Sequence, residues 1–283
     1  MAKIPQKVKN RLVSSIPKFK KILTQGKERD VNESDTVTII TDMLEEVFGF
    51  DKYSEITREF SIKGTYCDLA IKNGDKVEYL IEVKAIGISL KEKHLKQAIN
   101  YAAGAGITWV VITNGLDWEV HKVTVKGKVS NEQVFSFNVQ DLNLKKSDHL
   151  EMLFSLCKRG IEIDLIDDLY QYKQSVNRYT VGAILLSEST LNFVGRELKR
   201  LNSGIKVNSE ELASILEHEI LKRDLIDSEE VLKAQKMILK QKKSKNSRKD
   251  KALNTALPAP NMPILGIKPG VVSSGTNSSQ YSS

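Results

Sequence analysis

The apolar run over residues 107–112, Ile-Thr-Trp-Val-Val-Ile, places the strongest constraint on the fold of this chain. A short strand with almost no polar alternation is typical of a sheet that is covered on both faces. Residues 91–103, which precede the run, carry apolar side chains at helical spacing, and residues 118–125 follow an Asn-Gly turn and resemble a further strand. We therefore expect an α/β domain in which helices pack against a sheet.

Three more strands are predicted upstream of this run, over residues 55–62, 66–71 and 77–85. The second and third are separated by Asn73-Gly74, which is a strong hairpin signal because both residue types tolerate positive φ. A hairpin at this position places the two strands side by side in the sheet.

Composition divides the chain into four regions. Residues 1–30 are basic and partly helical in pattern, and residues 31–141 form the predicted α/β domain. Residues 147–240 are almost entirely helical in pattern and carry enough apolar side chains for a small bundle or a homodimer interface. Residues 241–283 are basic at first and then rich in Ser, Gly and Pro, a composition that predicts a disordered tail.

The chain has a formal net charge of +7, which is compatible with a polyanionic partner such as DNA. Much of the excess lies within residues 3–27 and 240–251, and runs of this kind are more often solvated faces or tails than binding sites. Neither a membrane-length apolar run nor a secretory signal is present, and Cys67 and Cys157 have neither disulfide-framework nor zinc spacing. We expect a cytoplasmic protein without a membrane partner.

Charged residues interrupt two of the predicted strands. Side chains two apart in a strand share a face, so Glu82 and Lys84 are expected to point the same way. Asp68 is expected to point away from Cys67 and Leu69 in the neighbouring strand. The hairpin then brings two carboxylates and one ammonium group together, and charges inside apolar strands destabilise the fold unless they are paired.

Metal-assisted phosphodiester hydrolysis accounts for such a set. Asp68 and Glu82 offer the carboxylate oxygens that Mg²⁺ prefers, Mn²⁺ is a substitute ion, and the Val83 carbonyl is a third protein ligand. Lys84 would orient the attacking water or stabilise the negative charge of the transition state. The plain alternative is a surface salt bridge, but an aspartate 14 residues before the Glu-x-Lys triplet, across a hairpin, favours a site.

Six pieces of sequence occur in an order that is typical of one family. They are Glu33 within Asn-Glu-Ser-Asp-Thr, the helix end at Gly49, Tyr-Cys-Asp-Leu-Ala-Ile around Asp68, Leu-Ile-Glu-Val-Lys-Ala from Leu80 to Ala85, Gln97 with Tyr101, and Thr113-Asn114-Gly115 followed by Trp118. Together they resemble the N-terminal nuclease domain of type I restriction enzyme R subunits, within the PD-(D/E)xK superfamily. Cys67 departs from the pattern, since the superfamily's name has proline there.

The resemblance implies a restriction-endonuclease-like mixed sheet and further roles for particular residues. Glu33, on a helix that Asn32 or Ser34 caps, would help to hold the metal or its waters. Gln97 and Tyr101 match a Q-x-x-x-Y motif that would steady the DNA strand and the active site, with Gln97 counted among the catalytic residues. Ordinary packing on the helix surface is the alternative for this pair, because residues four apart share one side of a helix.

The sequence contains no G-x-x-x-x-G-K-[ST] motif, so we expect no ATP site, and separate motor or specificity subunits would have to be other chains. Our interpretation is a Mg²⁺-dependent DNA endonuclease of the restriction type that uses a metal-activated water. The alternative is a catalytically inactive subunit that keeps the nuclease fold and serves in DNA binding or assembly.

Overall fold

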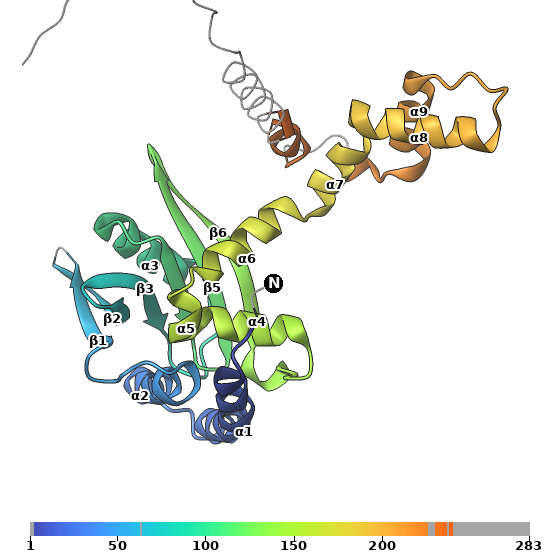
Figure 1. The fold of residues 1–283 in the computed structure, drawn as a ribbon. Helices are drawn as coiled ribbons and strands as arrows, with labels where there is room; N and C mark the ends of the chain where they lie inside the picture. The colour runs from blue at the N-terminus through green and yellow to red at the C-terminus, as the bar shows by residue number, and fades with distance from the viewer. Residues whose placement is uncertain (1–2, 63, 226–229, 237, 240–283) are drawn as a thin grey trace, which may run out of the picture. The chain divides into compact units, whose positions relative to one another are not determined.

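The computed structural model describes residues 3–62, 64–225, 230–236 and 238–239 (Figure 1). The chain divides into two compact units, Met1–Asn177 and Arg178–Ser283. The helices of residues 147–175 therefore belong to the first unit, together with the α/β region.

The first unit is built on a six-stranded mixed sheet in the order β1-β2-β3-β4-β5-β6 (Figure 1). The strands are β1 (Ile56–Ile62), β2 (Thr65–Asn73), β3 (Lys76–Val83), β4 (Trp109–Thr113), β5 (Asp117–Lys126) and β6 (Lys128–Asn138). Neighbouring strands are antiparallel except β3 and β4, which run parallel and are connected through helix α3 (Glu92–Ala105). The predicted fold class, a mixed sheet with flanking helices and a helical module, is confirmed.

Helices cover both faces of the sheet. The other helices of this unit are α1 (Gln6–Glu28), α2 (Glu33–Met43), the π-helical turn η1 (Leu44–Phe48), the 3-10 turn η2 (Val139–Asp141), α4 (Ser147–Leu156), α5 (Lys158–Ile161) and α6 (Leu165–Ser175). Val110 of β4 packs in the core beneath α3, whereas Val111 belongs to the larger core that includes α1, α2 and α4. The run that constrained the fold is therefore buried on both sides, as predicted.

Helix α1, expected as a basic lead-in, contributes directly to the larger core. Leu12, Ile16 and Leu23 are fully buried in that core, while lysines occupy the remaining surface of the helix. The Arg11 guanidinium donates to the carbonyls of Val47 at 2.9 Å and of the next residue at 3.1 Å. These bonds satisfy carbonyl groups at the end of η1, which a helix end otherwise leaves without partners.

Strand β6 differs from the sequence-based expectation, which ended the sheet near residue 125. Its first six residues are exposed, so no apolar alternation marks the strand in the sequence. Backbone pairing with β5 from Lys126↔Lys128 to Asp117↔Asn138 forms it instead. Backbone hydrogen bonds form whatever the side chains are, so the hydrophobic pattern of the sequence did not predict this strand.

The second unit is helical, as predicted. Its elements include α7 (Arg178–Leu185), α8 (Glu188–Leu201), α9 (Ser209–Ile215), the π-helical turn η3 (Leu216–Ile220) and the 3-10 turn η4 (Arg223–Leu225), and residues 230–236 are also helical. Asn208 caps α9, since its side chain accepts a hydrogen bond from the Glu210 N–H at 3.1 Å. The predicted disorder of residues 241–283 lies outside the described residues. Within the described ranges, every helix is too short or too polar to span a membrane.

Candidate metal centre

The structure brings together three of the charged side chains singled out in the sequence. Asp68 lies on β2, and Glu82 lies on the adjacent strand β3, with Lys84 directly after that strand. The Lys84 Nζ is 3.0 Å from Glu82 Oε1, and Asp68 Oδ2 accepts a hydrogen bond from the Val83 N–H at 2.7 Å. The hairpin therefore places two carboxylates and an ammonium group in one cluster.

The alternation of side chains on β2 breaks at Asp68. Cys67 belongs to the core beneath α3, whereas Leu69 belongs to the core on the opposite face. The prediction that Cys67 and Leu69 point the same way is therefore wrong. On the neighbouring strand β1, Glu59 lies opposite Asp68, and its backbone has a φ of 49°, in the left-handed region. The register of β1 with β2 is the same on both sides of this position. Nothing in the sequence marks Glu59, because a single glutamate in a strand carries no signal of positive φ.

The carboxylates of this cluster are held in a poorly solvated place. Burial raises the pKa of Glu82 to about 7, and the negative charge of Asp68 adds to the effect while Lys84 opposes it. Burial also raises the pKa of Asp68, although the Val83 N–H and Lys84 act in the opposite direction. For Lys84, burial alone would lower the pKa, but the surrounding carboxylates together hold it above its ordinary value. The ammonium group is therefore charged at neutral pH.

One carboxylate oxygen of this cluster has no hydrogen-bond partner among the described residues. Glu82 is only 1% exposed, and within the described residues its Oε2 atom has no hydrogen-bond partner. A buried carboxylate oxygen without a partner is costly, and a cation would remove the cost. Asp68 and Glu82, with the Val83 carbonyl, form the oxygen-rich donor set that fits a magnesium ion.

The donor set is incomplete for a fully enclosed ion. In the part of the chain that the structure covers, no group of three or more His, Cys, Asp and Glu side chains is placed to hold a metal. Burial raises the pKa of the neighbouring Cys67 thiol to about 12, and Cys67 belongs to the apolar core beneath α3. Two carboxylates suit Mg²⁺, which keeps several waters, better than zinc, which takes nitrogen and sulfur ligands.

Glu33 joins the cluster through the lysine. It is the first residue of α2, and its Oε2 lies 3.3 Å from the Lys84 Nζ. Asn32 caps the helix, because its Oδ1 accepts a hydrogen bond from the Asp35 N–H at 2.9 Å. The predicted cap is thus Asn32, and its role is to fix the helix start that presents Glu33 to Lys84.

Replacing this cap tests how firmly α2 is held. Asn32→Ala is expected to lower the free energy of unfolding by about 1 kcal/mol, since one N–H at the helix start loses its partner. Urea unfolding followed by tryptophan fluorescence measures it, because Trp109 and Trp118 are the two tryptophans of the chain and both lie in the first unit. Asn100→Ala, at an exposed position of α3, serves as the matched control and should change stability by less than about 0.5 kcal/mol. Equal stabilities for the two variants would contradict a structural role for the cap.

Gln97 lies on the exposed side of α3, and Ala98 and Ala102 pack in the core beneath the helix. Tyr101 is half-buried and packs against that core. The Gln97 Nε2 donates a hydrogen bond to the Tyr101 Oη at 3.0 Å. This hydrogen bond joins the two side chains of the motif to each other. The structure places the motif on the helix between β3 and β4 without bonding it to the carboxylates.

The start of α3 lies near the charged cluster. His94 accepts a hydrogen bond at Nδ1 from the Lys91 N–H at 3.3 Å. Burial, together with the charges of Lys93 and Lys84, lowers the pKa of His94. His94 is therefore neutral at pH 7, and Lys84 is close enough to act on it.

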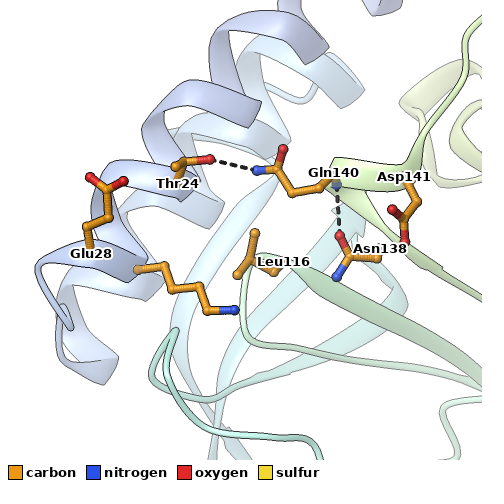
Figure 2. Close-up of a pocket in the computed structure, with 7 residues that line it drawn as sticks. Thr24, Glu28, Leu116, Asn138, Gln140 and Asp141 are labelled. Carbon is orange, nitrogen blue, oxygen red and sulfur yellow. Dashed lines mark hydrogen bonds between the residues drawn. The ribbon is translucent and has the colours of Figure 1, made fainter.

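A cavity of about 610 Å³ lies elsewhere on the first unit, between the end of α1 and the ends of β5 and β6 (Figure 2). The Gln140 Nε2 donates to Thr24 Oγ1 at 3.1 Å, and the Gln140 N–H donates to Asn138 Oδ1 at 2.8 Å. Its lining does not include Asp68, Glu82 or Lys84. Thr24, Asn138 and Gln140 are paired with one another, and no buried polar atom without a partner is found in this lining among the described residues. The unpartnered buried atom lies in the cluster on β2 and β3 instead.

Comparison with protein families agrees with the sequence reading. Residues 40–135 match the family described as the type I restriction enzyme R protein N terminus. The resemblance stated from the sequence is thereby confirmed, and the matched segment runs from α2 into β6 and includes Asp68, Glu82 and Lys84. No curated protein and no solved structure gave a match. The family points to a nuclease-related role for this segment.

Proposed function

We propose that the first unit is a Mg²⁺-dependent DNA endonuclease of the restriction type. The observation that carries the proposal is the buried, unpartnered Glu82 Oε2 beside Asp68, with Lys84 3.0 Å from the other oxygen of Glu82. Burial and mutual repulsion disfavour the charged forms of these two carboxylates, and such pairs are typical of cation-binding sites. The family match over residues 40–135 supports DNA as the substrate class.

In this proposal Asp68, Glu82 and the Val83 carbonyl hold the ion, and Glu33 acts on its waters. Mg²⁺, or Mn²⁺ in its place, would polarise the scissile phosphate and make a bound water acidic. The hydrogen bond from the Val83 N–H fixes the Asp68 carboxylate in one orientation, so that its second oxygen is presented in a constant place. This arrangement needs no covalent intermediate with the protein.

Lys84 is positioned by two carboxylates. Glu82 Oε1 at 3.0 Å and Glu33 Oε2 at 3.3 Å restrain its ammonium group without burying it completely. A restrained positive charge can orient the attacking water and stabilise the extra negative charge on the phosphate in the transition state. Gln97 and Tyr101, already bonded to each other, would contact the DNA strand from α3.

The proposal leaves several partners to other chains. The family match supports association with motor or specificity subunits, which would supply any ATP-driven step. A second copy of this chain, joined through the helical unit, would supply the second active site needed to cut both strands of a duplex.

Cleavage of supercoiled plasmid tests the proposal. The purified chain should nick or linearise the circle with Mg²⁺ or Mn²⁺ and leave it intact with EDTA, and a closed circle reports endonuclease action alone. Lys84→Ala should reduce the rate about a hundredfold, because one preorganised charge near the phosphate is lost. Lys76→Ala, at the first residue of β3, removes an ammonium group that pairs with Glu78 at 2.7 Å, and this variant should cleave as the wild type does.

Two outcomes would count against a nuclease at this site. If Lys84→Ala cleaves as fast as the wild type, the activity arises elsewhere or from a contaminant. If no form of the protein cleaves with either ion, but all bind DNA in a salt-sensitive way, the chain is the inactive DNA-binding or assembly subunit.

A further inference from the structure

Strands β1 and β2 part from regular pairing at one position. The register joins Arg58 to Leu69 and Phe60 to Cys67, so the residue between them on β1 is Glu59, at the position opposite Asp68. Glu59 lies at φ 49° and is exposed. Residues held in sparsely populated backbone conformations cluster at functional sites.

Glu59 is unfavourable at this position for two separate reasons. A residue with a Cβ atom is strained in the left-handed region, where glycine is not. Its carboxylate also lies opposite that of Asp68 on the neighbouring strand, and like charges at directly opposite positions destabilise a sheet. The shape of the backbone alone would be served better by glycine. A glutamate here therefore indicates a use for its carboxylate.

A second observation indicates that a cation binds near these carboxylates. Glu82 Oε2, on the strand beyond Asp68, is buried and has no hydrogen-bond partner among the described residues. Glu59, Asp68 and Glu82 follow one another across β1, β2 and β3, with the lowest exposure at Glu82 and the highest at Glu59. A cation bound at the buried end would therefore face solvent on the side of Glu59.

We propose that Glu59 is a further acidic group of the cation site and acts through the waters that a divalent ion keeps. The inference rests on the proposed function, in that Asp68 and Glu82 are taken as the direct ligands. An exposed carboxylate on the solvent side suits hydrogen bonds to coordinated waters, which Mg²⁺ retains in number. Glu59 is thus a positioning residue, whose charge and hydrogen bonds strengthen ion binding without a direct bond to the metal.

Titration of the full chain with Mn²⁺ tests this role in the absence of DNA. Glu59→Gln should weaken Mn²⁺ binding about tenfold, the lower end of the range for groups that act on a metal through its first ligands. Glu78→Gln is the matched control, because Glu78 lies on β3 and its carboxylate is paired with Lys76. Mn²⁺ affinity of that control should equal the wild-type value.

Glu59→Gly separates a metal role from a structural one. Removing the strained side chain should raise the melting temperature in EDTA by about 2–4 °C, as expected for relief of one left-handed residue in a unit of this size. The same variant should bind Mn²⁺ as weakly as Glu59→Gln. A purely structural Glu59 would give the stability gain with unchanged affinity, and that result would overturn the inference.

The outcome for Asp68→Asn tells the two proposals apart. If that variant loses Mn²⁺ binding while Glu59→Gln and Glu59→Gly keep wild-type affinity, the site stands and only the role of Glu59 is refuted. If Asp68→Asn binds Mn²⁺ as tightly as the wild type, the proposed centre itself is wrong, and the role of Glu59 falls with it.

Discussion

An Asp68→Asn variant is expected to cleave plasmid DNA with Mg²⁺ about a thousandfold more slowly than the wild type, or slower still. The substitution keeps the size of the side chain, and the amide oxygen can still accept the hydrogen bond that the Val83 N–H gives to Asp68 Oδ2 at 2.7 Å. What it removes is one of the two negative charges that attract the ion. An effect at or above the upper end of those seen for single electrostatic groups is expected, because ion binding and transition-state stabilisation are both weakened.

The measurement is the initial rate of loss of supercoiled plasmid over a range of Mg²⁺ concentrations. Asp75→Asn is the control, since Asp75 lies exposed in the turn between the same two strands and carries the same charge. DNA affinity in EDTA, measured for all three proteins, should be equal or slightly higher for Asp68→Asn, because a negative charge has been removed. A variant that cleaves at more than a tenth of the wild-type rate at saturating Mg²⁺ would refute the assignment of Asp68.

The central hairpin was predictable because two local signals agreed. Asn73-Gly74 fixed the turn, and alternation in the third strand fixed which side chains share a face with Glu82. The observed hairpin, β2 to Asn73 and β3 from Lys76, follows from these features. Side-chain period and turn chemistry are both properties of neighbouring residues, so a single sequence contains them.

The details around the hairpin were not predictable for a physical reason. The ion pair of Glu33 with Lys84 joins residues far apart in the chain, and only packing of α2 against the sheet brings them to 3.3 Å. The sequence also contains no signal for the left-handed backbone at Glu59 or for the change of face between Cys67 and Leu69. Local signals thus located the charged groups of the cluster, whereas tertiary contacts decided their partners.

The burial of the Glu82 carboxylate leads to a second prediction, which concerns the stability of the fold. Glu82→Gln is expected to raise the free energy of unfolding by about 3 kcal/mol in EDTA at pH 8, although it removes a direct ligand of the proposed ion. Burial raises the pKa of Glu82 to about 7 in the folded protein from an ordinary value of 4.5, so at pH 8 folding must keep a carboxylate charged where burial disfavours the charge. A neutral amide avoids this cost, and Lys84 keeps Glu33 as a partner.

The pH dependence gives this expectation its sign. A carboxyl group whose pKa rises on folding binds its proton more tightly in the folded state, so its stabilising contribution is complete below pH 4.5 and is lost as the pH rises towards 7. The advantage of Glu82→Gln should therefore be small at pH 5 and largest at pH 8, measured by urea unfolding with tryptophan fluorescence. Glu78→Gln, on the same strand, should show no such trend.

With Mn²⁺ the order of stability of the wild type and Glu82→Gln should reverse, because ion binding stabilises only the protein that keeps both carboxylates. A Glu82→Gln protein less stable than the wild type in EDTA at pH 8 would mean that the bond to Lys84 outweighs burial, and the cluster would then be a structural ion pair.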